Sequence, residues 1–225
     1  WQIASDEKLS FLGVSAALID VWRQQNIVPK QKHELGSLRT IASTGSPLAA
    51  SGFDWVEESV GSEVSVVSIA GGTDLCGCLV LGVPTEKVRR GEIQGPALGL
   101  DVVVLRADGT EADPLEDGEL VCRTPFPTVP LGFWGDDNRS KIQAAYFDRF
   151  EGIWAHGDHA RRTATGGFEI LGRLDATLNS KGVRIGTAEI YRVVLTVSGI
   201  SGALAVAQPA GNDTRVVLFV VCDGE

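Results

Sequence analysis

The pattern of apolar and polar positions changes from helical to strand-like spacing several times in the first third of the chain. Leu9–Gln25 carries apolar residues mostly at helical spacing, which predicts a helix. Leu38–Ala42 is a short apolar run typical of a strand, and Val64–Ala70 is apolar or small almost throughout, as in a strand buried on both faces. A further helix is expected over about residues 51–62. This alternation predicts a layered α/β domain.

A loop of small and polar residues follows each of these two strands. The loops are Thr44–Pro47 (TGSP) and Gly71–Asp74 (GGTD). Ligands of such sheets bind outside the carboxyl ends of the strands, so we expect both loops to face one crevice. Small side chains let the backbone approach a flat or phosphorylated ligand closely. Thr73 beside Asp74 suits a phosphate oxygen and Mg²⁺, although a simple turn at the end of a strand would look the same.

The middle of the chain favours short strands rather than alternating helices and strands. Strands are expected over Leu98–Leu105, Glu119–Cys122 and Gly167–Leu171, a turn over Ala107–Thr110, and a short helix over Asn138–Phe147. This order predicts a smaller, antiparallel β unit.

The pattern changes once more at a polar segment that begins at Gly172. Thr187 is a good N-cap for a helix that runs to about Val197. Apolar strands are expected over Ala203–Ala207 and Val216–Val221. We therefore expect the chain to divide into residues 1–174 and the start of a second domain in residues 175–225.

Composition and charge exclude several classes of protein. The 225 residues are 44% hydrophobic and 22% charged, which is an ordinary globular balance. A net charge of −9 disfavours nucleic acid and anionic membranes as partners, although a small anionic ligand is not excluded. The longest apolar runs fall well short of the ~20 residues of a membrane span.

Cysteine usage indicates a reducing compartment. The four cysteines are Cys76, Cys78, Cys122 and Cys222. Without zinc-ligand spacing they are expected to be reduced, buried thiols of a cytoplasmic protein. A thiol nucleophile at Cys76 or Cys78 is the functional alternative.

Charged residues of the second half could hold an anionic ligand. Asp158 is expected in a small loop after an aromatic-rich stretch, where its carboxylate could accept two ribose hydroxyls or simply stabilise a turn. His156 and His159 flank it, but their spacing alone suits a metal only loosely. Arg173 and Arg184 could cradle an anion, or they could be solvated surface charges.

Together, these segments resemble the adenylate-forming superfamily of acyl- and aryl-CoA synthetases. The motifs, in the order found in that superfamily, are Ser43–Leu48 (STGSPL), Gly71–Asp74 (GGTD), His156–Asp158 (HGD) and Gly172–Tyr191 (GRLDATLNSKGVRIGTAEIY). Within it, the chain is most similar to the acetoacetate-activating ligases. This narrower likeness rests on Ser68–Asp74, Arg90–Gln94, Gly118–Cys122 and Ala145–Phe147.

The resemblance implies an ATP-dependent ligase that converts acetoacetate to an acyl-adenylate and then to acetoacetyl-CoA. ATP, Mg²⁺ and coenzyme A are the implied cofactors and substrates, with no nucleic acid or membrane partner. Residues 1–174 would be the C-terminal part of the large adenylation domain, and residues 175–225 the start of the small C-terminal domain. A ligase for another short acid, such as propionate or butyrate, and a non-catalytic nucleotide-binding module remain the alternatives.

The resemblance also implies a role for individual residues. The nucleotide would contact Gly45, Ser46, Pro47, Gly71, Gly72, Thr73, Asp158, Arg173 and Arg184. Of these, Thr73 and Arg184 would act on the phosphates in catalysis, and Asp158 and Arg173 on the ribose. Asp74 would hold Mg²⁺, with a side chain one methylene shorter than the more usual Glu. Asp175 would be the domain hinge, and Lys181 and Gly182 would border the coenzyme A channel, with Lys181 replacing the small residue expected there.

Two further expectations concern the acid and the length of the chain. Acetate-activating relatives place a bulky aromatic two residues before the Thr, where this chain has Gly71, so we expect room for a four-carbon keto acid. Size alone discriminates by only about 1–3 kcal/mol. The superfamily's Gly-rich phosphate loop and its catalytic Lys have no counterpart here, so we expect this chain to be a fragment, inactive in adenylation.

Overall fold

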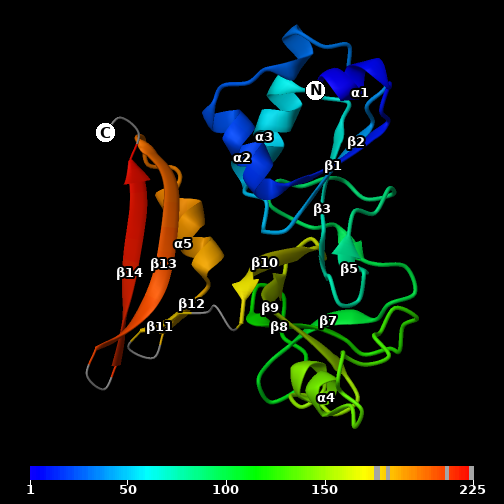
Figure 1. Cartoon of the computed structure of the whole chain (residues 1–225), viewed down its shortest axis with the longest axis vertical. Coiled ribbons are helices and arrows are strands. Elements are labelled where there is room, and N and C mark those ends of the chain that lie inside the picture. Colours follow the sequence, from blue (N-terminus) through cyan, green and yellow to red (C-terminus); the bar gives the residue numbers. More distant parts are fainter. Residues whose placement is uncertain (175–177, 181–182, 211–212, 223–225) are drawn as a thin grey trace.

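The structure, a computed structural model, describes residues 1–174, 178–180, 183–210 and 213–222 (Figure 1). Its first part is a parallel sheet in the order β1-β2-β3, formed by Phe11–Ser15, Thr40–Thr44 and Ser65–Ser68. The helices of this part are α1 (Gln2–Asp6), α2 (Ala16–Gln24), the 3-10 helix η1 (Pro29–Gln31) and α3 (Ala50–Ser59). Parallel strands connected by helices confirm the predicted α/β layering.

The helix expected over Leu9–Gln25 is wrong in its first part. Phe11–Ser15 forms β1 and pairs in parallel with β2, and the helix begins only at Ala16. The Ser15 hydroxyl caps α2 by accepting a hydrogen bond from the Leu18 amide at 3.1 Å. A short apolar run fits either period, so pairing with β2 decides its conformation.

The helices and the parallel sheet share one apolar core. Ile19 of α2, Ile41 of β2 and Val56 of α3 are completely buried. Beside them Trp22 stacks on Trp55 with ring centroids 5.8 Å apart. Burial of each such aliphatic side chain stabilises the fold by about 1.5–3 kcal/mol.

A small antiparallel sheet follows the parallel one. It consists of β4 (Ala70–Gly72), β5 (Gly77–Leu81) and β6 (Gly95–Pro96). The strand expected over Val64–Ala70 therefore ends at Ser68, and its alternate residues are only half-buried rather than buried on both faces. Gly71 and Gly72, expected in a loop, lie in β4 and pair with Cys78 and Gly77.

The predicted antiparallel β unit is confirmed as a sheet in the order β10-β9-β8-β7. Its strands are β7 (Val102–Leu105), β8 (Asp117–Cys122), β9 (Trp154–Arg162) and β10 (Phe168–Arg173), and helix α4 (Ser140–Tyr146) packs on it. Strand β9 was not expected, so Asp158 lies within a strand and not in a loop. Gly157, with φ of +79°, gives β9 a local irregularity that other residues adopt only with strain.

The last part confirms the predicted helix and two strands. It comprises β11 (Leu178–Ser180), β12 (Val183–Ile185), α5 (Thr187–Val194), β13 (Ile200–Ala210) and β14 (Asp213–Cys222). The N-cap of α5 is Gly186 rather than Thr187, and a Cβ at Gly186 would lie 2.4 Å from the Leu171 carbonyl oxygen. The close packing of α5 on β10 therefore requires glycine at the cap. The domain boundary at residue 175 stays a prediction, because that residue lies outside the described ranges.

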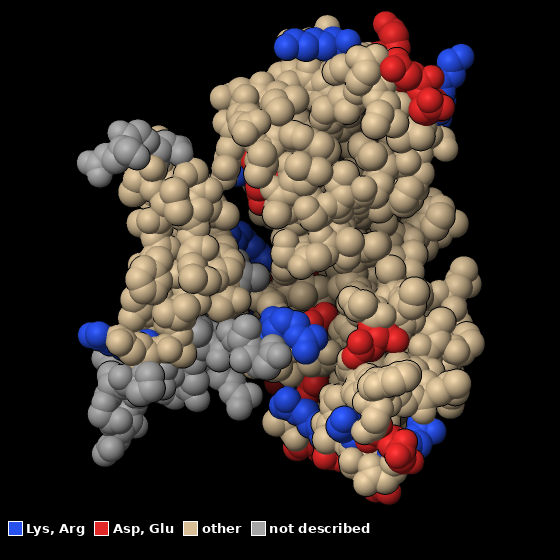
Figure 2. All heavy atoms as spheres, in the orientation of Figure 1, with Lys and Arg blue, Asp and Glu red and all other residues tan. Residues whose placement is uncertain are grey.

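The surface is mixed in charge. Figure 2 shows acidic and basic side chains interspersed on the lower part of the visible face and again along its top edge, with few charges between them. None of the helices built from the described residues is long and apolar enough to cross a membrane.

Candidate functional site

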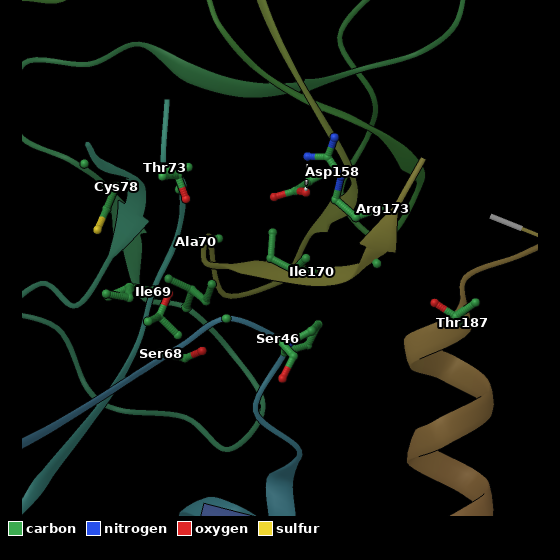
Figure 3. Close-up of a pocket in the computed structure, with 18 of the residues that line it drawn as sticks. Ser46, Ser68, Ile69, Ala70, Thr73, Cys78, Asp158, Ile170, Arg173 and Thr187 are labelled. Atoms are coloured by element: carbon green, nitrogen blue, oxygen red, sulfur yellow. Dashed lines mark hydrogen bonds and ion pairs between the residues drawn. The ribbon is translucent and has the colours of Figure 1, made fainter. Parts of the chain in front are cut away.

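A cavity of about 750 Å³ lies where several of these elements meet (Figure 3). Its walls come from the β2–α3 loop, from β4 and β5, from β9 and β10, and from the first turns of α5. Eight of the expected site residues line it, namely Gly45, Ser46, Pro47, Gly71, Gly72, Thr73, Asp158 and Arg173. The structure thus brings both small-residue loops to one crevice, as the sequence predicted.

The β2–α3 loop offers backbone to the cavity. Gly45 has a φ of +86°, a left-handed conformation that favours glycine, and it follows directly after the last residue of β2. Gly45 and Ser46 are exposed, and Figure 3 shows the Ser46 hydroxyl at the lower edge of the cavity. A planar or anionic ligand can therefore approach this turn closely.

Strand β4 forms a second wall, and Gly71 has a different role there from the one expected. A Cβ at Gly71 would lie 2.0 Å from the Gly77 carbonyl oxygen and 2.6 Å from Cys78 Cα. Glycine at this position therefore permits β4 to pair with β5, and its missing side chain does not enlarge the cavity. The expectation that Gly71 leaves room for a longer acid by replacing an aromatic side chain is therefore wrong, because a side chain at Gly71 would point at β5.

Apolar side chains from other elements line the cavity instead. They are Ile69 before β4, Ala70 in β4, Ile93 before β6, and Ile170 in β10. Tyr191 of α5 also lines it, and the Tyr191 hydroxyl accepts a hydrogen bond from the Ala205 amide at 3.1 Å. The motifs quoted from the sequence include Ile93 and Tyr191, but neither these residues nor Ile170 was expected at the cavity, because only the packing of separate elements places them here.

Asp158 and Arg173 form an ion pair at the upper edge of the cavity (Figure 3). Arg173 Nη1 lies 3.2 Å from Asp158 Oδ1 and also donates to the His156 carbonyl oxygen at 2.9 Å. The Asp158 residue is buried, with 8% of its surface exposed. Asp158 is therefore not a turn residue, and Arg173 is not merely a solvated charge. The pair presents an oriented carboxylate at the wall of the cavity.

His156 is a buried neighbour of Asp158. Trp154 Nε1 donates a hydrogen bond to His156 Nδ1 at 3.2 Å, and His156 Nε2 lies 3.6 Å from Asp158 Oδ2. Burial lowers the pKa of His156, although Asp158 and a hydrogen bond with the Gly71 backbone oppose that shift. The ring is therefore neutral near pH 7. Trp154 was missed in the sequence, although its position two residues before His156 places both on one face of a strand.

Asp74 lies just outside the cavity lining. Its Oδ2 accepts a hydrogen bond from the Tyr146 hydroxyl at 2.6 Å. Partial burial and then Asp74 raise the pKa of Tyr146 to about 12, so this hydroxyl keeps its proton. Asp74 is exposed, and a carboxylate oxygen is the ligand type that Mg²⁺ prefers, so the residue fits that ion.

Several expected site residues are not placed. Asp175, Lys181 and Gly182 lie outside the described residues. Arg184 is in β12, but only its backbone is described. Among the described side chains, one group could hold a metal ion, and it contains Asp117, His159 and Glu189 but not His156.

The cysteines differ from the expectation of four buried thiols. All four are free, but only Cys122 is buried, while Cys76 and Cys222 are exposed. Cys76 and Cys78 line the cavity. Burial raises the pKa of Cys78, which disfavours the thiolate that a nucleophile needs.

Comparisons with known proteins define the class. Residues 1–134, more than half of the chain, match the family described as AMP-binding enzyme. The chain belongs to the AMP-binding enzyme family.

Two curated relatives show which members of this family the chain is similar to. The chain is 49% identical over 217 residues to acetoacetyl-coenzyme A synthetase of Rhizobium meliloti (strain 1021), covering 96% of this chain and 33% of that protein. It is 41% identical over 224 residues to acetoacetyl-CoA synthetase of Gallus gallus, covering 98% of this chain and 33% of that protein. The chain thus spans about one third of the length of these curated relatives.

Solved structures share the fold. Acetoacetyl-CoA synthetase from Streptomyces lividans superposes with a TM-score of 0.85 at 35% identity, over 98% of this chain and 33% of that one. The anthranilate CoA ligase AuaEII, solved with anthranoyl-AMP, has a TM-score of 0.81 at 19% identity, over 100% of this chain and 41% of that one, and shows the fold alone. The predicted fold class, that of the adenylate-forming enzymes, is confirmed.

Proposed function

We propose that this chain belongs to an ATP-dependent acid–CoA ligase that activates acetoacetate through an acyl-adenylate and forms acetoacetyl-CoA. The observation that carries the proposal is the convergence of the Gly45–Pro47 loop, Thr73 and the Asp158–Arg173 pair on one cavity. The similarity to acetoacetyl-CoA synthetases of Rhizobium meliloti and Gallus gallus supports the choice of acid.

The nucleotide would span the cavity from the β2–α3 loop to β9. Gly45, Ser46 and Pro47 would contact adenine and the α-phosphate, with a backbone that leaves room for both. Gly71 and Gly72 would flank the same path, because both line the cavity next to Thr73. Across the cavity, the Asp158 carboxylate would accept hydrogen bonds from the ribose hydroxyls, and the Arg173 guanidinium would hold that carboxylate in place.

In the first step a carboxylate oxygen of acetoacetate attacks the α-phosphorus, and pyrophosphate leaves with the electron pair of the broken P–O bond. The Thr73 hydroxyl would donate a hydrogen bond to the α-phosphate, where negative charge develops. Arg184 would stabilise the same phosphates. Asp74, oriented by Tyr146, would hold Mg²⁺, which supplies charge neutralisation for the phosphates when bound.

In the second step the thiol sulfur of coenzyme A attacks the acyl carbon, the thiol proton passes to solvent, and AMP leaves with the electron pair of the broken C–O bond. Lys181 and Gly182 would border the coenzyme A channel, and Asp175 would be the hinge about which the C-terminal domain turns between the steps. The cytoplasmic location expected from the cysteines stays a prediction.

The lining of the cavity also suits short acids other than acetoacetate. The described walls near β4 are apolar, with Ile69, Ile93 and Ile170 among them, and Gly71 does not add room for a longer acid. Such walls accept any short acyl chain. Propionate and butyrate are therefore the competing acids.

The test is acid-dependent exchange of labelled pyrophosphate into ATP by a protein of the relatives' full length that carries this sequence. We expect kcat/KM to be highest for acetoacetate in a panel with acetate, propionate and butyrate. Faster exchange with butyrate or propionate would assign a different ligase. Binding of ATP without exchange for any acid would indicate a non-catalytic module.

Asp158→Ala tests the nucleotide site itself. Loss of two charge-assisted hydrogen bonds should weaken AMP binding roughly 10- to 100-fold, as measured by calorimetry. Asp113→Ala is the matched control, because Asp113 is exposed and does not line the cavity. Equal affinity in both variants would remove Asp158 from the site.

A further inference from the structure

Three aromatic rings connect the two carboxylates of the proposed site. Tyr146 stacks on Trp154 with ring centroids 3.8 Å apart and planes 13° apart, and the His156 ring lies 6.5 Å beyond Trp154. Asp74 accepts the Tyr146 hydroxyl at one end, and Asp158 faces His156 at the other. The ring set therefore joins the turn after β4 to the strand that carries Asp158.

The hydrogen bond from Trp154 fixes the protonation of His156. An indole nitrogen can only donate, so His156 Nδ1 must accept, and the proton of the neutral ring lies on Nε2. Nε2 is the atom that faces Asp158 Oδ2 at 3.6 Å. With 4% of its surface exposed, His156 has little access to water that could reorganise this arrangement.

The same ring packs against strand β4. A Cβ at Gly72 would lie 3.1 Å from His156 Cε1, so glycine at that position lets the imidazole approach the strand. The ring also has a hydrogen bond with the Gly71 backbone. Strand β4 leads directly into Thr73, so His156 lies between the wall that carries Thr73 and the wall that carries Asp158.

We propose that His156 is a positioning residue for nucleotide binding. Its Nε2 side, which lies 3.6 Å from Asp158 Oδ2 and packs beside Gly72, holds the part of β9 that carries Asp158 against strand β4. This inference rests on the proposed function, because the ligand it serves is the ribose and α-phosphate of an adenine nucleotide. No proton is transferred, since the ring stays neutral and acts through packing and through the attraction between its Nε2–H and the carboxylate. Trp154 supports the ring by fixing its tautomer and its orientation.

Substitutions that keep one ring nitrogen at a time separate this role from simple core packing. The amide nitrogen of Gln can take the place of Nε2, whereas the Asn side chain reaches only the position of Nδ1. AMP affinity measured by calorimetry should therefore fall roughly 10- to 100-fold in His156→Ala and His156→Asn, the loss typical when a partner that orients a ligand is removed. His156→Gln should stay within about threefold of the wild type, as the conservative replacement of the donor.

His159→Gln is the matched control. His159 is a buried histidine of the same strand, with Nε2 3.5 Å from Asp117 Oδ2, and it does not line the cavity. Its substitution should leave AMP affinity unchanged even where thermal stability changes. Equal AMP affinity of the Gln and Asn variants of His156 would overturn the positioning role, and this comparison holds even if His156→Ala fails to fold.

The tautomer of His156 can be measured, and a role in packing alone would not require a particular tautomer. Long-range ¹H–¹⁵N spectra of the histidine rings at pH 7 should show His156 neutral and protonated at Nε2. A ring protonated at Nδ1, or on both nitrogens, would overturn the inference without touching the proposed function. Wild-type protein that binds no AMP would overturn both, whereas AMP binding at wild-type affinity in His156→Ala would overturn the positioning role alone.

Discussion

At the scale of single residues, Gly71 permits strand β4 to pair with β5 because it has no side chain. A Cβ there would lie 2.0 Å from the Gly77 carbonyl oxygen, within the β4–β5 pairing. We predict that Gly71→Ala lowers the free energy of unfolding by about 1–3 kcal/mol, because two paired strands must separate to admit the methyl group. Urea denaturation would measure the change.

Gly36→Ala is the control for this substitution. A Cβ at Gly36 meets nothing within 4 Å, so its replacement should be neutral or slightly stabilising. If Gly71→Ala unfolds at the same urea concentration as Gly36→Ala, the β4–β5 contact does not limit this position.

At the scale of single elements, helix α4 depends on one buried aspartate. Asp136 Oδ1 accepts the Lys141 amide at 2.9 Å, and Oδ2 accepts the Ile142 amide at 3.0 Å. Burial alone would raise the pKa of Asp136, but these hydrogen bonds outweigh it and hold the pKa below its usual value. The ionised carboxylate therefore stabilises the start of the helix that carries Tyr146.

The sign of this shift sets a pH dependence. Because the folded pKa lies below the unfolded one, the contribution is present above about pH 4 and is lost as the pH falls through the folded pKa. We predict that Asp136→Ala destabilises the protein at pH 7, and that the difference from wild type shrinks at lower pH. Chemical denaturation across pH measures this, with the exposed neighbour Asp137→Ala as control. An equal loss at pH 3 and pH 7 would contradict the assignment.

The elements also show which strands an amino-acid pattern can predict. The apolar runs of β2 and β7 indicated strands, because those strands bury aliphatic side chains. Strand β9 was missed because its polar residues pair with charges on neighbouring strands, as Arg161 Nε does with Asp117 Oδ1 of β8 at 3.0 Å. Such partners lie far away in the sequence. A pattern read along one segment therefore cannot reveal them.

At the scale of the whole molecule, the sequence motifs predicted the polar residues of the cavity but not the apolar residues that line the rest of it. Thr73 and Asp158 could be singled out because their chemistry matches a phosphate and a ribose. Tyr191 and Ile170 reach the cavity only because α5 packs on β10. The sequence indicated His156 only as a loose metal ligand and as part of the HGD motif, because its contacts with Trp154 and Gly72 exist only after folding.

The length of the chain carries a prediction of its own. The chain spans about one third of its curated relatives. We predict that the 225-residue chain supports no pyrophosphate exchange, whereas a protein of the relatives' full length that carries it does. Exchange catalysed by the 225-residue chain alone would contradict this.

The account depends on one nucleotide contacting segments that are far apart in the sequence, and mapping the AMP site tests that directly. In ¹H–¹⁵N spectra recorded during titration with AMP, we expect the amides of Gly45, Ser46, Thr73 and Asp158 to shift together with one dissociation constant. Shifts confined to other parts of the chain, or no shift at saturating AMP, would contradict the account.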